Sequence, residues 1–167
     1  MKRLAPWLLC AGVLLSASPA GAQDSDCDFD QAYFAKRMQQ VAARHGGRLD
    51  AATGTAIWKL RNGETVTVAS GGCVHYGTTV SLVYAPGAPA PSREVAIERL
   101  FAAVSKYWQP AAARRLQALV QAGVYATKTL DDGSIELVGS LEPGESFSFE
   151  YRLVLGKHEV RISWEEA

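Results

Sequence analysis

The chain has 167 residues, with 17 Lys and Arg, 17 Asp and Glu and three His, so its formal net charge at pH 7 is zero. This balance leaves no surplus of cations to neutralise phosphates, which argues against nucleic acid as a partner. The length suits one ordinary domain, and 48% hydrophobic residues are enough to build a core.

Residues 1–22 have the features of an export signal. Lys2 and Arg3 form a basic start, a mostly apolar run follows, and Ala20-Gly21-Ala22 supplies small residues before a cleavage site. The apolar run is too short to span a bilayer, so we expect no membrane insertion after cleavage. We expect residues 23–167 to form a single soluble domain that is periplasmic or secreted. This mature chain keeps 15 Lys and Arg against 17 Asp and Glu.

Two cysteines, Cys27 and Cys73, remain in the mature chain. In an oxidising compartment such a pair most often forms a disulfide, and a closed loop of about 45 residues contributes about 3–4 kcal/mol in the chain-entropy model. A redox or nucleophilic cysteine is disfavoured because the chain has no Cys-x-x-Cys motif. The predicted disulfide ties the start of the first helix to a glycine-rich stretch.

The first predicted helix begins near Asp28 and runs to about Arg44. Gly46 and Gly47 supply its stop. Five side chains recur at helical spacing and predict the face that packs on the rest of the protein: Phe34, Met38, Val41, Ala42 and His45.

Strands follow this helix. Residues 55–60 and 65–68 alternate in character around Asn62-Gly63, which is a strong signal for a tight hairpin turn. The next strand is predicted from about Cys73 to Tyr84. Gly71, Gly72 and Gly77 interrupt it, which indicates a loop or a bulge.

A second helical region comes after the proline-rich connection of residues 85–91. Ser92 is a good helix cap, and apolar residues at helical spacing extend to Trp108. Pro110 breaks or restarts the helix, and the second segment ends before Gly123, the type of residue preferred just past a helix end.

The remainder of the chain predicts four strands. Residues 124–130 and 135–138 flank the turn signal Asp131-Asp132-Gly133. Residues 147–155 and 160–164 then alternate between an apolar and a mainly polar face.

These elements predict an α+β fold in a single domain. The expected order is one helix, three strands, two helical segments and four strands. Half-polar strands joined by short turns indicate an antiparallel sheet with one wet face, and the helices are expected to cover the other face. Each half runs from helix to hairpin-rich sheet, although no residue-level repeat is visible.

The best candidate site residues are His75 and Tyr76, within the stretch Gly71-Gly72-Cys73-Val74-His75-Tyr76-Gly77. On a regular strand Cys73 and His75 share one side, and a buried disulfide would carry a neutral, hydrogen-bonded His75 inward. If the glycines form a bulge instead, His75 and Tyr76 are presented to a ligand or partner. Both interpretations stay open at this point.

Familiar catalytic and metal-binding patterns are incomplete. His45, His75 and His158 lack metal-binding spacing, and the chain has neither Gly-x-Ser-x-Gly nor a phosphate-binding glycine loop. We therefore predict no metal, no cofactor and no assigned catalytic residue. Whether the protein is an enzyme stays undecided, with the balance against it.

The first functional hypothesis is an exported binding or inhibitory protein of the immunity type, acting on a protein partner through the surface loop at residues 73–77. One alternative is a small envelope hydrolase or metal-dependent enzyme that uses His75. Another is a carrier with an apolar pocket between sheet and helices, lined by residues such as Phe101, Trp108 and Phe149. The sequence names neither the partner nor the oligomeric state.

Overall fold

The computed structural model describes residues 30–72, 76–123, 125–131, 135–140 and 146–166. The predicted signal peptide, Cys27, Cys73 and His75 all lie outside the described residues. The predicted cleavage, the disulfide and the orientation of His75 therefore stay predictions.

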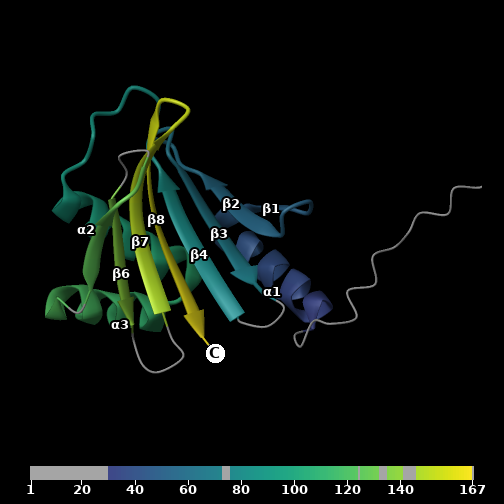
Figure 1. Cartoon of the computed structure of the whole chain (residues 1–167). Helices are drawn as coiled ribbons and strands as arrows, with labels where there is room; N and C mark the ends of the chain where they lie inside the picture. Colours follow the sequence, from purple (N-terminus) through teal and green to yellow (C-terminus); the bar gives the residue numbers. More distant parts are fainter. Residues whose placement is uncertain (1–29, 73–75, 124, 132–134, 141–145, 167) are drawn as a thin grey trace, which may run out of the picture.

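An eight-stranded antiparallel sheet forms the centre of the protein, with strand order β1-β2-β3-β4-β8-β7-β6-β5 (Figure 1). The predicted α+β class and single antiparallel sheet are thus confirmed. The strands are β1 (Arg48–Asp50), β2 (Thr55–Lys59), β3 (Thr65–Gly71), β4 (Tyr76–Val83), β5 (Ala126–Thr129), β6 (Ile135–Ser140), β7 (Ser146–Val154) and β8 (Lys157–Glu166).

The expected count of three strands in the first half was wrong, because β1 adds a fourth. Arg48 and Asp50 pair with β2 around a single apolar residue, Leu49. A segment of three residues with one apolar side chain is too short to show the alternation of apolar and polar residues that predicts a strand. The strand forms because β2 already offers an unpaired edge to the chain that leaves the first helix.

Three α-helices occur in the described part of the chain: α1 (Gln31–Ala43), α2 (Arg93–Ala103) and α3 (Pro110–Ala122). A 3-10 turn, η1 (Arg44–Gly46), extends α1, and a π-helical segment, η2 (Val104–Trp108), extends α2. The Asp30 carboxylate caps α1 by accepting from the Tyr33 backbone N–H, and the Ser92 hydroxyl caps α2 by accepting from that of Val95. No helix within the described ranges has the length and apolar character needed to cross a bilayer.

The core lies between the helices and one face of the sheet. Helix α1 contacts β1, β2 and β3, whereas α2 contacts β4 and β8. Strand residues that point toward the helices are almost fully buried, as their alternation predicts. They include Trp58, Val66, Val68, Val80, Leu82, Phe147, Phe149, Val160, Ile162 and Trp164.

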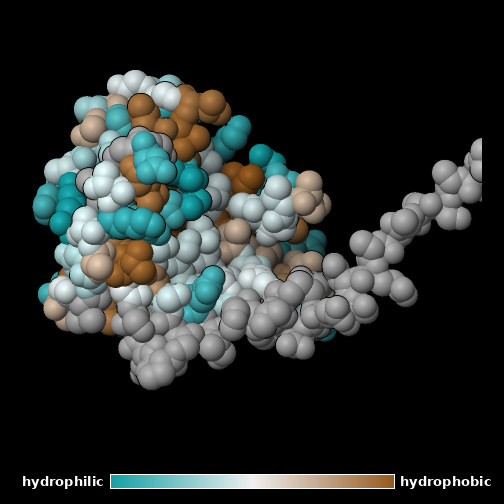
Figure 2. Space-filling view, in the orientation of Figure 1, coloured by the Kyte–Doolittle hydropathy of each residue, from teal (hydrophilic) through white to brown (hydrophobic). Residues whose placement is uncertain are grey.

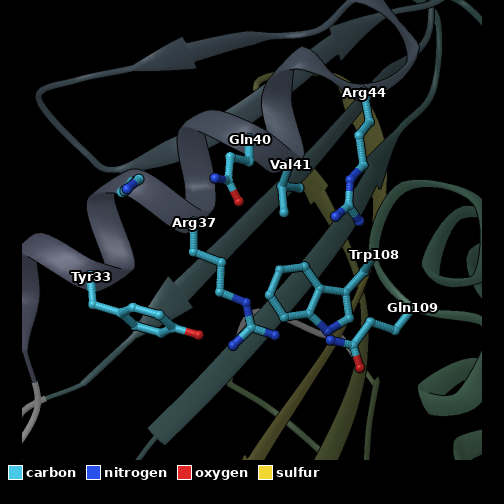
Figure 3. Close-up of a pocket in the computed structure, with 8 residues that line it drawn as sticks. Tyr33, Arg37, Gln40, Val41, Arg44, Trp108 and Gln109 are labelled. Atoms are coloured by element: carbon cyan, nitrogen blue, oxygen red, sulfur yellow. The ribbon is translucent and has the colours of Figure 1, made fainter.

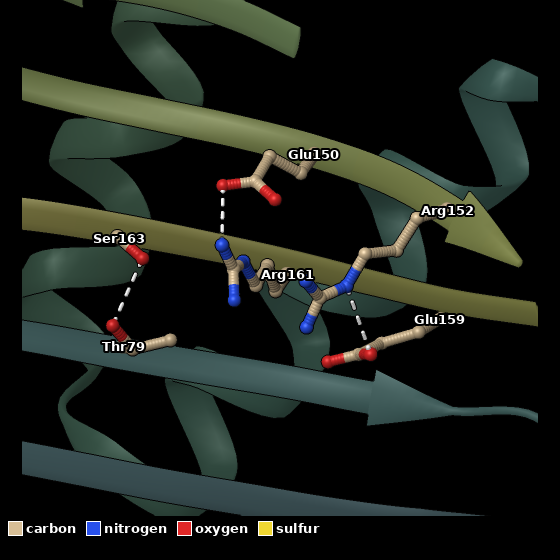
Figure 4. Close-up of polar contacts among 6 residues, drawn as sticks. All are labelled: Thr79, Glu150, Arg152, Glu159, Arg161 and Ser163. Carbon is tan, nitrogen blue, oxygen red and sulfur yellow. Dashed lines mark hydrogen bonds and ion pairs between the residues drawn. The ribbon is translucent and has the colours of Figure 1, made fainter. Parts of the chain in front are cut away.

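The opposite face of the sheet is polar. Figure 4 shows the helices behind the strands and polar side chains in front of them, and Figure 2 shows the same face in mostly teal and white. Arg161 lies opposite Glu150 with Nη2 2.7 Å from Oε1, and the Thr79 and Ser163 hydroxyls are 2.9 Å apart. Cross-strand pairs of this kind stabilise an exposed sheet face.

The two halves of the chain meet at the centre of the sheet. Each half contributes a four-stranded meander, and β4 pairs antiparallel with β8. Val80 lies directly opposite Ile162 at this junction, and neither side chain is exposed to solvent. The two halves thus follow the same plan: each begins at one edge of the sheet and adds its strands in chain order toward the centre.

Candidate functional site

Tyr76, one of the two predicted site residues, is the first residue of β4 and is partly buried. Its side chain faces α1: the ring stacks on Phe34 with centroids 5.0 Å apart, and its hydroxyl accepts a 2.5 Å hydrogen bond from the Ser70 hydroxyl. The guanidinium of Arg37 lies 5.8 Å from the ring centroid. Tyr76 therefore connects the end of the β3–β4 hairpin to the side chains of α1.

Helix α1 carries a second stripe of side chains beside its apolar one. The apolar residues Phe34, Met38, Val41 and Ala42 are buried against the sheet. Tyr33, Arg37, Gln40 and Arg44 follow at helical spacing along a neighbouring face, with Lys36 beside them. Figure 3 shows this stripe pointing toward Trp108.

Trp108 reaches this position from the π-helical segment η2. Its last turn is closed by a 3.0 Å hydrogen bond from the Gln109 N–H to the Val104 carbonyl, which spans five residues. Pro110 has no N–H to extend that ladder and begins α3 instead. Tyr107 packs on Trp58 with ring centroids 4.8 Å apart, while the adjacent Trp108 faces α1. Segments of π-helix frequently occur at functional sites.

Together α1 and η2 form an open cleft of about 510 Å³ (Figure 3), which we call the α1–η2 cleft. Its described lining residues include the cations Lys36, Arg37 and Arg44, and no Asp or Glu is among them. Arg37 lies over the indole of Trp108, 4.7 Å from the ring centroid. The described residues that line it are Tyr33, Lys36, Arg37, Gln40, Val41, Arg44, Trp108 and Gln109.

A second hollow of about 440 Å³ lies along the other side of α1. Gly71 and Gly77, which bound the predicted glycine-rich stretch, line it together with Phe34 and Ser70. Neither glycine has a positive φ, and a methyl group on Gly71 would meet nothing within 4 Å. A Cβ at Gly77 would make only ordinary contacts of 3.7–3.9 Å, so neither position requires glycine for its backbone conformation or for close approach.

The three residues proposed to line a carrier pocket are not brought together. Phe101 lines a groove between α2 and α3, Trp108 lines the α1–η2 cleft, and Phe149 lines a separate apolar pocket of about 200 Å³. That apolar pocket also contains Leu137 and Tyr151. It is smaller than the roughly 300–1,000 Å³ typical of small-molecule sites.

Neither of the two described histidines is among the described lining residues of the α1–η2 cleft. His45 was expected to continue the apolar face of the first helix, but it is exposed, because the chain leaves the helix at Arg44 and His45 has a φ of 60°. His158 Nδ1 lies 2.7 Å from the Tyr151 hydroxyl. Among the described residues, no three His, Cys, Asp or Glu side chains gather as a metal site would require.

A buried polar cluster lies elsewhere, between α2 and the sheet. Arg99 forms a 2.5 Å ion pair with Glu64, whose side chain is 6% exposed, and its guanidinium lies 4.9 Å from the ring centroid of Tyr84. Burial raises the pKa of Tyr84 above its ordinary value, and the positive charge of Arg99 offsets this only in part. Arg99 contacts both Glu64 and the face of the Tyr84 ring, which favours a structural role for the cluster.

Comparison with protein-family models, curated proteins and solved structures finds no match to this chain. The sequence pattern selected Tyr76, whose role in binding stays a prediction, and the α1–η2 cleft beside it was not predicted. The signal was present in the spacing of Tyr33, Arg37 and Arg44, although their meeting with Trp108 depends on tertiary packing.

Proposed function

We propose that this chain is an exported binding protein of the cell envelope, and that it binds its partner with the surface around α1 and the end of the β3–β4 hairpin. One observation carries the proposal. Open hollows of about 510 Å³ and 440 Å³ flank α1 on two sides, and Tyr76 and Gly77 of the predicted stretch adjoin them. Concave surfaces with converging polar and aromatic groups are the usual sites of recognition.

The exposure of Tyr33 supports the same surface. Its side chain is 58% exposed at the rim of the α1–η2 cleft and contacts Phe34 edge-on. Tyrosine offers a large, stiff contact area with a polar tip and is enriched at the centres of interfaces. Exposed tyrosine beside an arginine and a tryptophan is thus a composition that favours binding.

The test is capture of partners from the envelope fraction of the producing organism with residues 23–167, wild type against Tyr33→Asp. Tyr33 is the third residue of α1, where a carboxylate suits the positive end of the helix dipole, so the variant should fold. Val95→Asp is the matched control, because Val95 is the third residue of α2 and 45% exposed. His75→Ala tests the predicted loop directly.

We expect a partner that Val95→Asp retains and that Tyr33→Asp loses by about tenfold or more, the size of a typical interface hot spot. Equal capture by wild type and Tyr33→Asp would reject this surface. In a separate preparation, the full chain of residues 1–167 is produced with its predicted signal, and mass spectrometry of the exported protein should show an N-terminus at Gln23, which tests export.

Two alternative functions, an envelope hydrolase and an apolar carrier, predict different experimental results. An envelope hydrolase using His75 predicts turnover that His75→Ala abolishes. An apolar carrier predicts ligands displaced by enlarging Leu137 at the 200 Å³ pocket, with no effect of Tyr33→Asp.

A further inference from the structure

The cations of the α1–η2 cleft differ from three arginines elsewhere in the described part of the chain, which are paired with glutamates. Arg99, Arg152 and Arg161 each form an ion pair with a glutamate that is mostly buried: Glu64, Glu159 and Glu150. Within the ranges that the structure describes, Lys36, Arg37 and Arg44 form no ion pair. Three like charges along one wall of a concave surface repel one another, and an anion would relieve this repulsion.

Arg37 contacts two aromatic rings, and among the described residues its hydrogen-bond donors have no acceptor. Its guanidinium lies between two aromatic rings, 4.7 Å from the Trp108 centroid and 5.8 Å from that of Tyr76. A cation–π contact attracts the charge toward the ring and leaves N–H groups available. No hydrogen bond joins Arg37 to another described side chain, so this pre-positioned fork can bind an oxyanion in a bidentate way.

The size and polarity of the cleft define the ligand further. A volume of about 510 Å³ exceeds the need of a single inorganic ion and falls within the range of small organic ligands. Gln40 and Gln109 contribute amide groups that can bond to hydroxyls, and the Tyr33 side chain closes one end of the lining. The site thus combines charge for an anion with neutral polar groups for an attached organic body.

We propose that the α1–η2 cleft binds a small, freely diffusing organic anion with two or more negative charges on phosphate or carboxylate groups. This inference rests on the proposed binding function and names the chemistry of its ligand. Arg37 and Arg44 bind the oxyanion groups, Lys36 adds charge, and the two glutamines contact the organic body.

The experiment is calorimetry at low salt on residues 23–167 with glucose 6-phosphate, citrate and inorganic pyrophosphate, and with glucose as the neutral probe. The cleft variant is Lys36→Gln/Arg44→Gln, which removes two exposed cations and keeps the Arg37–Trp108 contact. The control is Arg48→Gln/Lys59→Gln, two exposed cations on β1 and β2 outside the cleft. Both doubles change the net charge equally.

We expect at least one of the organic anions to bind, glucose not to bind, and the cleft double to weaken binding by about tenfold or more while the control stays within about twofold. Arg37→Gln should weaken binding likewise. Equal loss in both doubles would overturn the proposal, because it would show general charge attraction. Absence of binding by every anion at millimolar concentration would also overturn it.

Trp108 supplies a local readout. Binding in the cleft should change the intrinsic fluorescence, because Trp108 is among the described lining residues of the cleft whereas Trp58 and Trp164 are not. Trp108→Phe should remove that fluorescence change, whatever its effect on the calorimetric affinity. A fluorescence change that survives in Trp108→Phe would place the ligand elsewhere and contradict the assignment.

Vesicles separate a soluble ligand from a lipid headgroup. Phosphatidylglycerol vesicles are compared with phosphatidylcholine vesicles by co-sedimentation, and binding to the former alone, without binding of any free anion, would overturn the proposal. Capture that still depends on Tyr33 while all anions fail would reject only the ligand chemistry and leave the proposed binding function standing.

Discussion

Tyr84 shows how a single residue couples stability to pH. Its side chain is 4% exposed, and burial holds its pKa above the ordinary value of 10.0. The folded state therefore keeps its proton at a pH where the unfolded chain has begun to lose it. The stabilising contribution is complete below about pH 10 and falls as the pH rises through the folded-state pKa.

Between pH 9 and pH 11.5 we expect the free energy of unfolding to fall less for Tyr84→Phe than for wild type, because Phe has no proton to release. At pH 7 the variant should lie within about 1 kcal/mol of wild type, since the buried hydroxyl has no hydrogen-bond partner among the described residues. Urea unfolding across this pH range measures both. Tyr33→Phe, at an exposed site, should follow wild type, and a Tyr84→Phe profile parallel to wild type would contradict the argument.

The end of α1 depends on the space around Gly47. A Cβ at this position would clash with the Trp58 indole and lie 2.7 Å from the Ala42 carbonyl oxygen. The same indole donates a 2.8 Å hydrogen bond from Nε1 to the Arg44 carbonyl, so the helix end and the tryptophan are fixed together. The glycine is therefore needed for close approach, with a φ of −79° that any residue adopts.

Gly47→Ala should lower the free energy of unfolding by about 1–3 kcal/mol, the usual cost of overpacking. Gly71→Ala is the control, since a methyl group there meets nothing within 4 Å and the change should stay within about 1 kcal/mol. Denaturant unfolding followed by intrinsic tryptophan fluorescence measures the difference. Equal stability of the two variants would show that the helix end adjusts freely.

The elements that sequence reasoning located are those with local signals. Asn62-Gly63 marked the β2–β3 turn, Ser92 marked the start of α2, and Gly123 adopts the left-handed conformation expected just past α3. Strand β1 was missed because one apolar residue carries no period. The pairing of β4 with β8 was not predicted either, because partners about eighty residues apart leave no local signal.

The candidate site was predictable only in part, for a related reason. Tyr76 was selected from its glycine-rich surroundings, and it does adjoin the α1–η2 cleft through Arg37. In the sequence, the charged stripe of α1 has the pattern of an ordinary solvent-exposed helix face. Its significance depends on the π-helical turn that aims Trp108 at it, and five-residue hydrogen bonding has no sequence signature of its own.

For the whole molecule, the Cys27–Cys73 disulfide stays the main prediction outside the described residues. Reduction should lower the free energy of unfolding by about 3–4 kcal/mol, because the bond closes a loop of about 45 residues in the unfolded chain. Guanidinium unfolding with and without reductant measures this loss. Cys27→Ser/Cys73→Ser without reductant should match the reduced protein, and two titratable thiols in freshly purified protein would contradict the pairing.

The central pairing of β4 with β8 also sets the order in which the protein can reach its final state. Strand β4 receives its second neighbour from β8, the last strand in the chain, so its backbone groups stay unpaired on that side until residues 157–166 arrive. Contacts between such distant segments make folding slow. If the chain crosses a membrane N-terminus first, the edge of β4 stays unpaired until residues 157–166 have crossed. A chaperone or a second copy of the chain would bind at this unpaired edge.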